Sequence, residues 1–363
     1  MEPVDPVTPA RRGRGAAINP PNRFDRLHYL EDPEELGEDE LRQVPTQFLD
    51  DTSRSILAHN DSPDVPFTYS INPYRGCEHG CIYCYARPSH EYLGFSAGLD
   101  FETRILVKRE APRLLAEALS KRSWQPQAIA LSGNTDPYQP VERRLKLTRS
   151  VLQVLLDFRN PVSIITKNHL VTRDVDLLSD LASMNLVHVT VSVTSLRPEL
   201  ISVMEPRTSR PEHRLKAIQT LDRAGIPVAV NVAPLIPGLT DEEMPEILKA
   251  AAQAGARSAQ YIVVRLPGPV KDLFLEWLQR EFPQRRGKVL NRLRELRGGR
   301  LNDPRWKHRM RGEGEWADTF SALFRASCQR YGLARKWVDL SIDQFCVPAE
   351  RREGPKDAQL GLF

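Results

Sequence analysis

Three of the five cysteines in this chain of 363 residues lie within eight positions, at Cys77, Cys81 and Cys84. The spacing C-x3-C-x2-C places the three thiols on one short loop, which can aim all three sulfur atoms at a single point. Three thiolates leave one position open on a metal centre that prefers four ligands. A reactive centre needs an open position and a structural site avoids one, so the loop predicts a metal site that carries out chemistry.

Two other interpretations of this loop stay open. Zinc could bind the three cysteines with His79 as the fourth ligand, although His79 is only two residues from Cys77 and from Cys81, which crowds a shared tetrahedral site. The thiols could also be unrelated buried side chains, which their density along the chain disfavours. On chemical grounds we favour an iron–sulfur cluster.

Neither membrane insertion nor export is indicated by the sequence. No apolar run approaches the roughly 20 residues that cross a bilayer, and the N-terminal segment 1–24 lacks the apolar core of a signal peptide. We therefore expect a cytoplasmic protein without a membrane partner. Because thiols stay reduced in the cytoplasm, clustered cysteines there are more often metal ligands or redox groups than disulfides.

From about residue 66 to residue 283 the chain alternates between strand-like and helix-like segments. Strands are predicted at 67–76, 128–135, 161–168, 186–195, 226–238 and 259–267. A helix is expected after each of them, as at 143–158, where apolar spacing is shown by Leu145, Val151, Leu152 and Leu155. Alternation of this kind implies parallel strands with right-handed crossovers, in a doubly wound sheet or a barrel. Functional groups are then expected at the carboxyl ends of the strands.

Composition divides the chain into four parts. Residues 1–60 are rich in proline and charge and predict an N-terminal tail and lead-in, partly disordered. Residues 61–283 hold the alternating strands and helices, and residues 284–346 predict a basic helical extension. Residues 347–363 predict a flexible tail.

The cysteine motif, with Tyr83 directly before the last cysteine and a strand before the loop, resembles that of the radical S-adenosylmethionine (SAM) superfamily. The wider sequence is similar to the spore photoproduct lyase-like subgroup, most of whose members are uncharacterised. The matching stretches are NDSPDVPFTYSINPYRGCEHGCIYCYARPSHEYLGFSAGLDFETRILVK and GNTDPYQPVERRLKLTR. The resemblance extends over most of residues 12–283.

The resemblance implies an α/β fold, namely a partial (β/α)6 TIM-type barrel of parallel strands, here followed by the basic helical C-terminal extension. A [4Fe-4S] cluster would bind Cys77, Cys81 and Cys84, and its fourth iron would bind the amino and carboxylate groups of SAM. One electron, supplied by a flavodoxin-type or ferredoxin-type donor, would cleave SAM and yield a 5′-deoxyadenosyl radical that abstracts hydrogen from the substrate. The protein would supply orientation, tuning and exclusion of water.

The resemblance also indicates which residues contact SAM. The candidates are Tyr83, Ser132, Gly133, Asn134, Asp136, Lys167, Ser192, Asn231 and Arg265. The segment 132–136 follows the second strand and would meet the amino group, Lys167 would pair with the carboxylate, and Ser192 would contact the ribose or carboxylate. Asn231 and Arg265 are polar residues in apolar strands, so each needs a ligand or an internal partner.

Simpler roles are available for most of these residues. Asn134 and Asp136 could cap a turn before Pro137, and Lys167 could be a surface lysine. Ser192 could fill a small space in the core, and Tyr83 could be an ordinary core residue.

The chain departs from spore photoproduct lyase at one position of the family pattern. That enzyme uses a cysteine at the end of the second strand as a hydrogen donor, and the corresponding stretch IALSGNTD has none. The remaining thiols are Cys328 and Cys346, and most free cysteines are buried structural residues. Repair of the thymine photoproduct is therefore not assigned.

Two further features point towards DNA. The stretch 280–311 carries twelve Lys or Arg against three acidic residues, a local net charge of +9 in a chain of net charge +4. This is either a solvated helix surface or a surface for phosphate-bearing partners. The last residues QLGLF resemble the peptide that docks bacterial proteins on the sliding clamp, through Gln359, Leu360, Leu362 and Phe363.

These observations leave three hypotheses for the function. The first is a radical SAM enzyme that acts on nucleic acid or a nucleotide, with DNA repair as its setting. The second is a radical SAM enzyme for a small molecule or a protein. The third is a zinc-containing nucleic-acid-binding module without catalysis.

Overall fold

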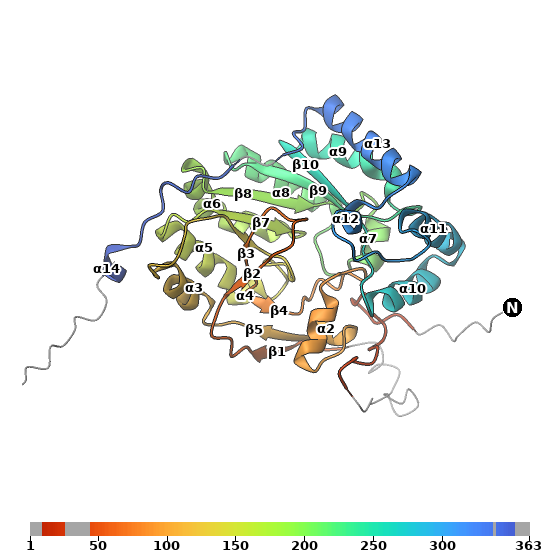
Figure 1. The fold of residues 1–363 in the computed structure, drawn as a ribbon, viewed down its shortest axis with the longest axis horizontal. Helices are drawn as coiled ribbons and strands as arrows, with labels where there is room; N and C mark the ends of the chain where they lie inside the picture. Colours follow the sequence, from red (N-terminus) through yellow and green to blue (C-terminus); the bar gives the residue numbers. More distant parts are fainter. Residues whose placement is uncertain (1–8, 26–43, 337–338, 353–363) are drawn as a thin grey trace, which may run out of the picture.

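The computed structural model describes residues 9–25, 44–336 and 339–352, which are built around two β-sheets (Figure 1). The larger sheet contains, in spatial order, β10 (Ser258–Val263), β9 (Val228–Leu235), β8 (Val187–Ser192), β7 (Val162–Thr166), β6 (Ile129–Leu131), β3 (Tyr69–Ile71) and β2 (Leu57–His59). The smaller sheet contains, in order, β1 (Gln47–Asp50), β5 (Arg104–Val107) and β4 (Tyr74–Arg75).

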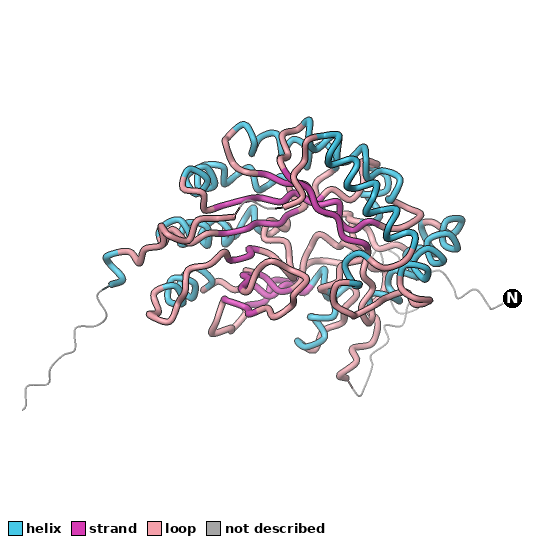
Figure 2. The backbone as a smooth tube through the Cα atoms, turned by 45° about the horizontal axis from the view of Figure 1, so that its top comes forward, coloured by secondary structure: helices cyan, strands magenta, loops and turns pink. Residues whose placement is uncertain are grey.

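The six predicted strands form the parallel part of the larger sheet. Every neighbouring pair from β3 to β10 is parallel, whereas β2 joins β3 antiparallel at one edge. Figure 2 shows the strands inside the molecule and helices on its outside. The α/β class and the partial barrel of parallel strands are therefore confirmed.

The predicted crossover helices are present. They are α3 (Ala111–Leu119), α5 (Leu147–Asp157), α6 (Val175–Ser183), α8 (Pro211–Arg223), α9 (Met244–Gln253) and α10 (Val270–Glu281). On α5 the buried residues Leu147, Val151, Leu152 and Leu155 recur at helical spacing, so one apolar stripe faces the sheet. The prediction of a single helix across 143–158 is wrong, because Lys146 has φ +54° and separates α5 from the short helix α4 (Glu142–Leu145).

Short helices occupy the connections at the carboxyl ends of the strands. They are η1 (Arg87–Leu93), α2 (Leu99–Thr103), η2 (His169–Asp174), α7 (Pro198–Met204) and η3 (Asp241–Glu243). η1 and α2 follow the cysteine loop, and α7 lies between β8 and α8. These connections carry most of the predicted site.

The C-terminal extension is helical and packs on the outside of the barrel. It contains α11 (Pro283–Leu296), α12 (His308–Arg311) and α13 (Glu315–Tyr331), and the short helix α14 (Ala349–Arg352) lies in the segment 347–363 that was predicted as a tail. α13 lies along α9 (Figure 1), and its buried residues Phe320 and Phe324 belong to the main hydrophobic core. None of the helices in the described ranges combines the length and the apolar character that crossing a membrane requires.

The extension also connects the two edges of the partial barrel. α12 packs against the edge strand β10, and Arg309 Nε lies 2.5 Å from Asp64 Oδ2 in the loop between β2 and β3. The backbone N–H of Lys307 donates to Asp64 Oδ1 at 2.7 Å. The open side of the barrel is thus spanned by α12 and the 60–66 loop.

The described part of the N-terminal lead-in is held by one buried carboxylate. Glu102 accepts hydrogen bonds from the backbone N–H groups of Gly15 at 3.0 Å and Ala16 at 2.9 Å. It also forms an ion pair with Arg87 at 2.5 Å, and both side chains of this pair are 0% exposed. Arg87 in turn donates twice to the carbonyl of Cys81, at 3.1 and 2.9 Å. The pair therefore joins the lead-in to the cysteine loop.

We expect Glu102→Gln to destabilise the protein strongly. The change leaves the Arg87 guanidinium buried without its counter-charge, which typically costs about 3 to 5 kcal/mol. The free energy of unfolding, measured by urea denaturation, should fall by that amount. Glu117→Gln is the matched control, because Glu117 pairs with Arg113 on the surface and should leave the denaturation midpoint unchanged. Equal effects of the two variants would contradict the structural role of Glu102.

His90 braces the same loop from η1. Its side chain is fully buried, and Nε2 lies 3.0 Å from the carbonyl oxygen of Arg104. A Cβ atom added to Gly76 would lie 3.0 Å from the His90 ring, so the ring packs directly against the residue before Cys77. Burial lowers the pKa of His90 to about 4.

This pKa predicts a loss of stability in mild acid. Below about pH 6.5 the unfolded chain takes up a proton on His90 that the folded chain does not, so the free energy of unfolding falls as the pH falls towards 4. The contribution of this residue is on the order of 3 kcal/mol over that range. In His90→Gln the decline should be smaller by that amount, as measured by denaturant titrations at pH 4 to 7. Parallel pH profiles for the two proteins would refute the assignment.

Candidate functional site

The backbone of the cysteine loop is fixed by neighbouring elements on both sides. The N–H of Cys77 donates to the carbonyl of Phe101 at 2.8 Å, and the N–H of Ile82 donates to the carbonyl of Met204 at 3.1 Å. Gly80 adopts φ +67°, and a Cβ atom there would lie 2.8 Å from a carboxylate oxygen of Glu102. Only glycine suits this position, so packing determines the shape of the loop.

Cys77 is buried, and Cys81 and Cys84 are partly buried. Burial raises the pKa of Cys77, Cys81 and Cys84, and for the first two the pKa lies well above its ordinary value. Charge on Asp136, Cys81 or Cys84 would raise the pKa of Cys77 further. Hydrogen bonds from the backbone amides of Ala86 and Arg87 act on Cys84 in the opposite direction. A metal bound to these sulfurs would hold them as thiolates.

His79 is not positioned to complete a zinc site with the three cysteines. Among the described residues, no group of three or more His, Cys, Asp or Glu side chains is arranged to hold a metal ion. In an iron–sulfur cluster the thiolates bind different irons, so they need not meet at one ion. Both ring nitrogens of His79 face protein atoms, with Nδ1 3.4 Å from Asp136 Oδ2 and Nε2 3.2 Å from Asn168 Nδ2. His79 is therefore not placed as a fourth ligand of a zinc site.

The inner face of the larger sheet carries small and polar side chains. Along β8 the residues Val187, Val189 and Val191 belong to the hydrophobic core, so the alternate residues Thr190 and Ser192 lie on the other face. Other residues that register places on this face are Ser70, Ala130, Ser163 and Asn231. Parallel strands that are covered on both faces are usually apolar throughout, so this face is suited to a polar ligand.

Two buried polar atoms on this face lack partners. Thr190 Oγ1 and Asn231 Oδ1 have no hydrogen-bond partner in the part of the chain that the structure describes. Leaving such atoms unpaired costs a few kcal/mol, which a bound ligand with polar groups would offset. Asn231 pairs in register with Ser192, so two of the predicted SAM contacts are neighbours. Both residues fit a ligand such as SAM.

Lys167 lies at the centre of the site rather than on the surface. Its Nζ donates to Thr194 Oγ1 at 3.0 Å and to the carbonyl of Ala233 at 2.9 Å, and it lies 3.2 Å from Glu205 Oε1. Burial, together with the nearby Arg214, lowers the pKa of Lys167 to about 7, although negative charge on Cys81 acts to raise it. The surface alternative is therefore wrong, and pairing of Lys167 with the SAM carboxylate stays a prediction.

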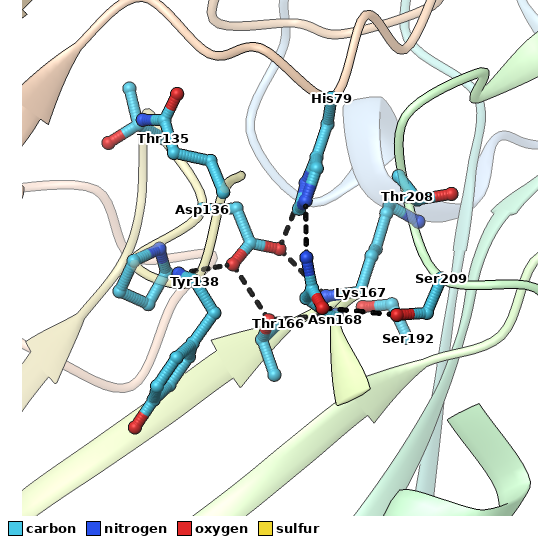
Figure 3. Close-up of polar contacts among 12 residues, drawn as sticks. His79, Thr135, Asp136, Tyr138, Thr166, Lys167, Asn168, Ser192, Thr208 and Ser209 are labelled. Atoms are coloured by element: carbon cyan, nitrogen blue, oxygen red, sulfur yellow. Dashed lines mark hydrogen bonds and ion pairs between the residues drawn. The ribbon is translucent and has the colours of Figure 1, made fainter. Parts of the chain in front are cut away.

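Asp136 is bonded within the protein on both carboxylate oxygens (Figure 3). It accepts from Thr166 Oγ1 and from the backbone N–H of Lys167, both at 2.7 Å, and from the N–H of Tyr138 at 2.9 Å. Although burial alone would raise the pKa of Asp136, His79 and these donors hold it below its usual value. Asp136 therefore joins the cysteine loop, through His79, to the carboxyl end of β7.

The segment that follows β6 has an unusual backbone. Ser132 has φ +149° and Gly133 has φ +125°, and the N–H groups of Asn134 and Thr135 donate to Asn72 Oδ1 at 3.0 and 3.1 Å. The segment is thereby fixed beside the end of β3, and the cysteine loop begins after the next strand, β4. Its contact with the amino group of SAM stays a prediction, as does any cofactor contact of the exposed Asn134.

The two tyrosines of the loop, Tyr83 and Tyr85, lie in different surroundings. Tyr83 is buried, its hydroxyl donates to Glu205, and Lys167 Nζ lies 5.6 Å from its ring centroid. Tyr85 is 48% exposed, its hydroxyl donates to the carbonyl of Gly133, and the guanidinium of Arg265 lies 5.3 Å from its ring centroid. Arg265 thus has an internal partner, and together with Tyr85 it offers an aromatic and a cationic surface near the cysteine loop.

A buried ion pair at this site was not predicted from the sequence. Glu205 and Arg214, both 0% exposed, form an ion pair, and Glu205 also accepts from Thr194 Oγ1 at 2.6 Å. Arg214 further donates to the carbonyl of Ser192 at 3.1 Å. The dense polar run EPRTSRPEHR at 205–214, separated from the fourth predicted strand by nine residues, was the available signal.

The two remaining cysteines lie away from the site. The carbonyl of Cys328 on α13 accepts from Leu333, and the next residue, Ala334, bridges the first residue of β10. The N–H of Cys346 donates to the carbonyl of Phe158, directly after α5 and before β7. Both contacts are at the amino ends of strands, whereas the cysteine loop is at the carboxyl ends. Neither thiol is placed to act at the loop.

Many basic side chains of 280–311 are bound within the fold. Arg292 pairs with Asp241 at 2.7 Å and lies 4.1 Å from the ring centroid of Trp316. The other residues of this stretch with charged or carbonyl partners are Arg280, Arg285, Lys288, Arg297, Arg305 and Arg309. The charge of the stretch therefore contributes less to a nucleic-acid surface than its count indicates. The proposed clamp-binding residues 359–363 lie outside the described residues.

Comparison with other proteins identifies relatives along most of this chain. A protein of Mycobacterium tuberculosis, described as uncharacterized, is 38% identical over 250 residues, which cover 68% of this chain and 72% of that protein. An uncharacterized protein of Methanocaldococcus jannaschii is 33% identical over 175 residues, covering 48% of this chain and 63% of that protein. Both relatives are described as uncharacterized, so their similarity does not identify a reaction.

The fold is similar to that of spore photoproduct lyase. The structure of that enzyme complexed with dinucleoside spore photoproduct has a TM-score of 0.57 at 17% identity and covers 80% of this chain and 82% of that chain. A variant of the enzyme with bound SAM and the same dinucleoside has a TM-score of 0.56 at 18% identity and covers 80% and 81%. The family model of the radical SAM superfamily matches residues 71–251. The chain therefore belongs to the radical SAM superfamily.

Proposed function

We propose that this protein binds a [4Fe-4S] cluster through Cys77, Cys81 and Cys84 and cleaves SAM reductively. One observation carries the proposal: Cys77, Cys81 and Cys84 share one loop whose backbone is fixed by neighbouring elements, beside a polar sheet face with unpaired buried atoms. When bound, the cluster supplies the electron that cleaves SAM into methionine and a 5′-deoxyadenosyl radical. The polar sheet face then holds the cofactor.

The residues around the loop position and stabilise the charges of the site. Burial and Glu205 raise the pKa of Cys81, and Lys167 and Arg214 act in the opposite direction. Glu205 compensates these two cations and keeps them in place through contacts at 3.2 Å and closer. Asn231 and Ser192 offer hydrogen bonds for the ribose or carboxylate of SAM. The segment 132–134 lies beside the end of β3, where the amino group would be met.

We infer that the substrate is a nucleic acid or a nucleotide. Tyr85 and Arg265 support this inference, because an exposed ring can stack on a base and a guanidinium can bind a phosphate. The likeness in fold to an enzyme complexed with a dinucleoside agrees with it. The chain lacks a donor cysteine after its second barrel strand, so the final hydrogen transfer differs from that of spore photoproduct lyase.

The first prediction concerns the cluster itself. Cys81→Ala removes one of three thiolate ligands, so it should abolish iron and sulfide binding and all formation of 5′-deoxyadenosine with dithionite as reductant. Cys346→Ala is the matched control and should retain both, because Cys346 lies at the amino ends of the strands. Iron and sulfide analysis and product assays under anaerobic conditions measure the two effects. Normal cleavage by Cys81→Ala, or bound zinc without sulfide, would remove the proposed mechanism.

The second prediction concerns the substrate. In an anaerobic assay with a panel of DNA, RNA, nucleotides, small metabolites and peptides, a nucleic acid or nucleotide should be consumed together with SAM. If the substrate is DNA, the logarithm of its affinity should fall linearly with the logarithm of the salt concentration. Consumption of a peptide or another metabolite alone would favour the second hypothesis.

A further inference from the structure

A cavity of about 410 Å³ opens beside the cysteine loop. It is bounded by segments that follow three neighbouring strands, β6, β7 and β8. Its lining consists of Pro140, Arg143, Asn168, Arg207, Thr208, Ser209, Arg210 and His213. No acidic side chain of the described residues lines it, so the cavity is suited to an anionic partner.

Much of the positive charge of this cavity is not neutralised. Arg143 and Arg210 are exposed and make no side-chain hydrogen bond or ion pair with any described residue. The ring of His213 lies 6.0 Å from that of His169 between centroids. Burial lowers the pKa of His169, and His213, Lys216 and Arg143 lower it further. The lowered pKa of His169 thus reflects an excess of positive charge at this cavity.

The wall of the cavity is in direct contact with the cysteine loop. The backbone N–H of Arg207 donates to the carbonyl of His79 at 3.2 Å, and its guanidinium lies 3.1 Å from Glu78 Oε1. Asn168 Nδ2 lies 3.2 Å from His79 Nε2 (Figure 3). Glu78 and His79 directly follow Cys77 in the cysteine loop. One layer of side chains therefore separates the cavity from the residues proposed to bind the cluster.

We propose that this cavity is the docking surface of an acidic one-electron carrier protein. The inference rests on the proposed function, in which each cleavage of SAM consumes one electron. Carboxylates of the carrier pair with Arg143, Arg210 and His213, which brings its redox group against the outside of the cysteine loop. One electron leaves the reduced carrier and enters the site at the three cysteines, and the carrier dissociates oxidised by one electron.

A nucleic acid is the other anionic macromolecule that this charge would attract. The position of the cavity favours the carrier instead. Hydrogen abstraction takes place at the inner face of the sheet, where Ser192 and Asn231 lie, whereas the cavity contacts the loop through Asn168 and Arg207. A substrate must reach the inner face of the sheet, whereas an electron donor needs only to lie close to the cluster ligands.

The test reverses charge at the cavity without touching the groups that brace the loop. Arg143→Glu combined with Arg210→Glu is the test variant, and Arg143→Gln combined with Arg210→Gln is its neutral counterpart. Arg122→Glu combined with Arg223→Glu is the matched control, because both residues are exposed, make no side-chain ion pair with described residues and change the net charge equally. Reduced flavodoxin serves as the probe carrier, and dithionite serves as a reductant that needs no docking surface.

The Glu variant should weaken flavodoxin binding by about tenfold or more at low salt, and the neutral variant by less. The control should change it less than about twofold. Calorimetry with oxidised flavodoxin measures binding independently of turnover. Formation of 5′-deoxyadenosine should slow with reduced flavodoxin and stay unchanged with dithionite.

Several outcomes would overturn the inference. Unchanged flavodoxin affinity in the Glu variant, or an equal loss in the control, would show that the cavity is not the docking surface. Loss of affinity for a DNA duplex with flavodoxin binding intact would assign the cavity to nucleic acid. Failure of the proposed function is distinguishable, because the wild-type protein would then form no 5′-deoxyadenosine even with dithionite.

Discussion

The buried ion pair between Arg87 and Glu102 is the interaction on which the cysteine loop depends. Arg87 binds the carbonyl of Cys81 twice, and Glu102 binds the backbone of Gly15 and Ala16. Both charges are fully buried, so each is stable there only in the presence of the other. The loop therefore keeps its shape through charges that lie outside the site, and the three sulfurs are positioned by the fold.

A second buried group of charges defines the electrostatics beneath the loop. Glu205 lies between Lys167 and Arg214, so two cations and one anion are enclosed next to Cys81. Burial and Glu205 raise the pKa of Cys81, and the two cations offset this only in part. Asp136 and His79 form a further link from the loop to β7. The site thus combines a rigid backbone with a dense group of enclosed charges.

The number of basic residues in a stretch of the sequence did not predict where unpaired positive charge lies on the surface of this protein. The stretch 280–311 has the highest count of basic residues, yet Arg292 and Arg309 pair with acids that are distant in sequence, Asp241 and Asp64. Two arginines next to the site, Arg143 and Arg210, make no side-chain ion pair with any described residue and are 67 residues apart in the sequence. Pairing between distant charges is decided by packing, so it could not be predicted from composition.

The sequence by itself determined the alternation of strands and helices and the motif of three cysteines, because apolar periodicity and residue spacing are local properties. It also placed Ser192 and Asn231 at strand positions that prove to be neighbours in register. Only the tertiary structure decided that Lys167 lies beside Glu205 and that the carboxylate of Asp136 lies beside the ring of His79. The physical reason is that these contacts join segments 38 and 57 residues apart, and the free energy of a buried charge depends on its neighbours in space and not on its neighbours in the chain.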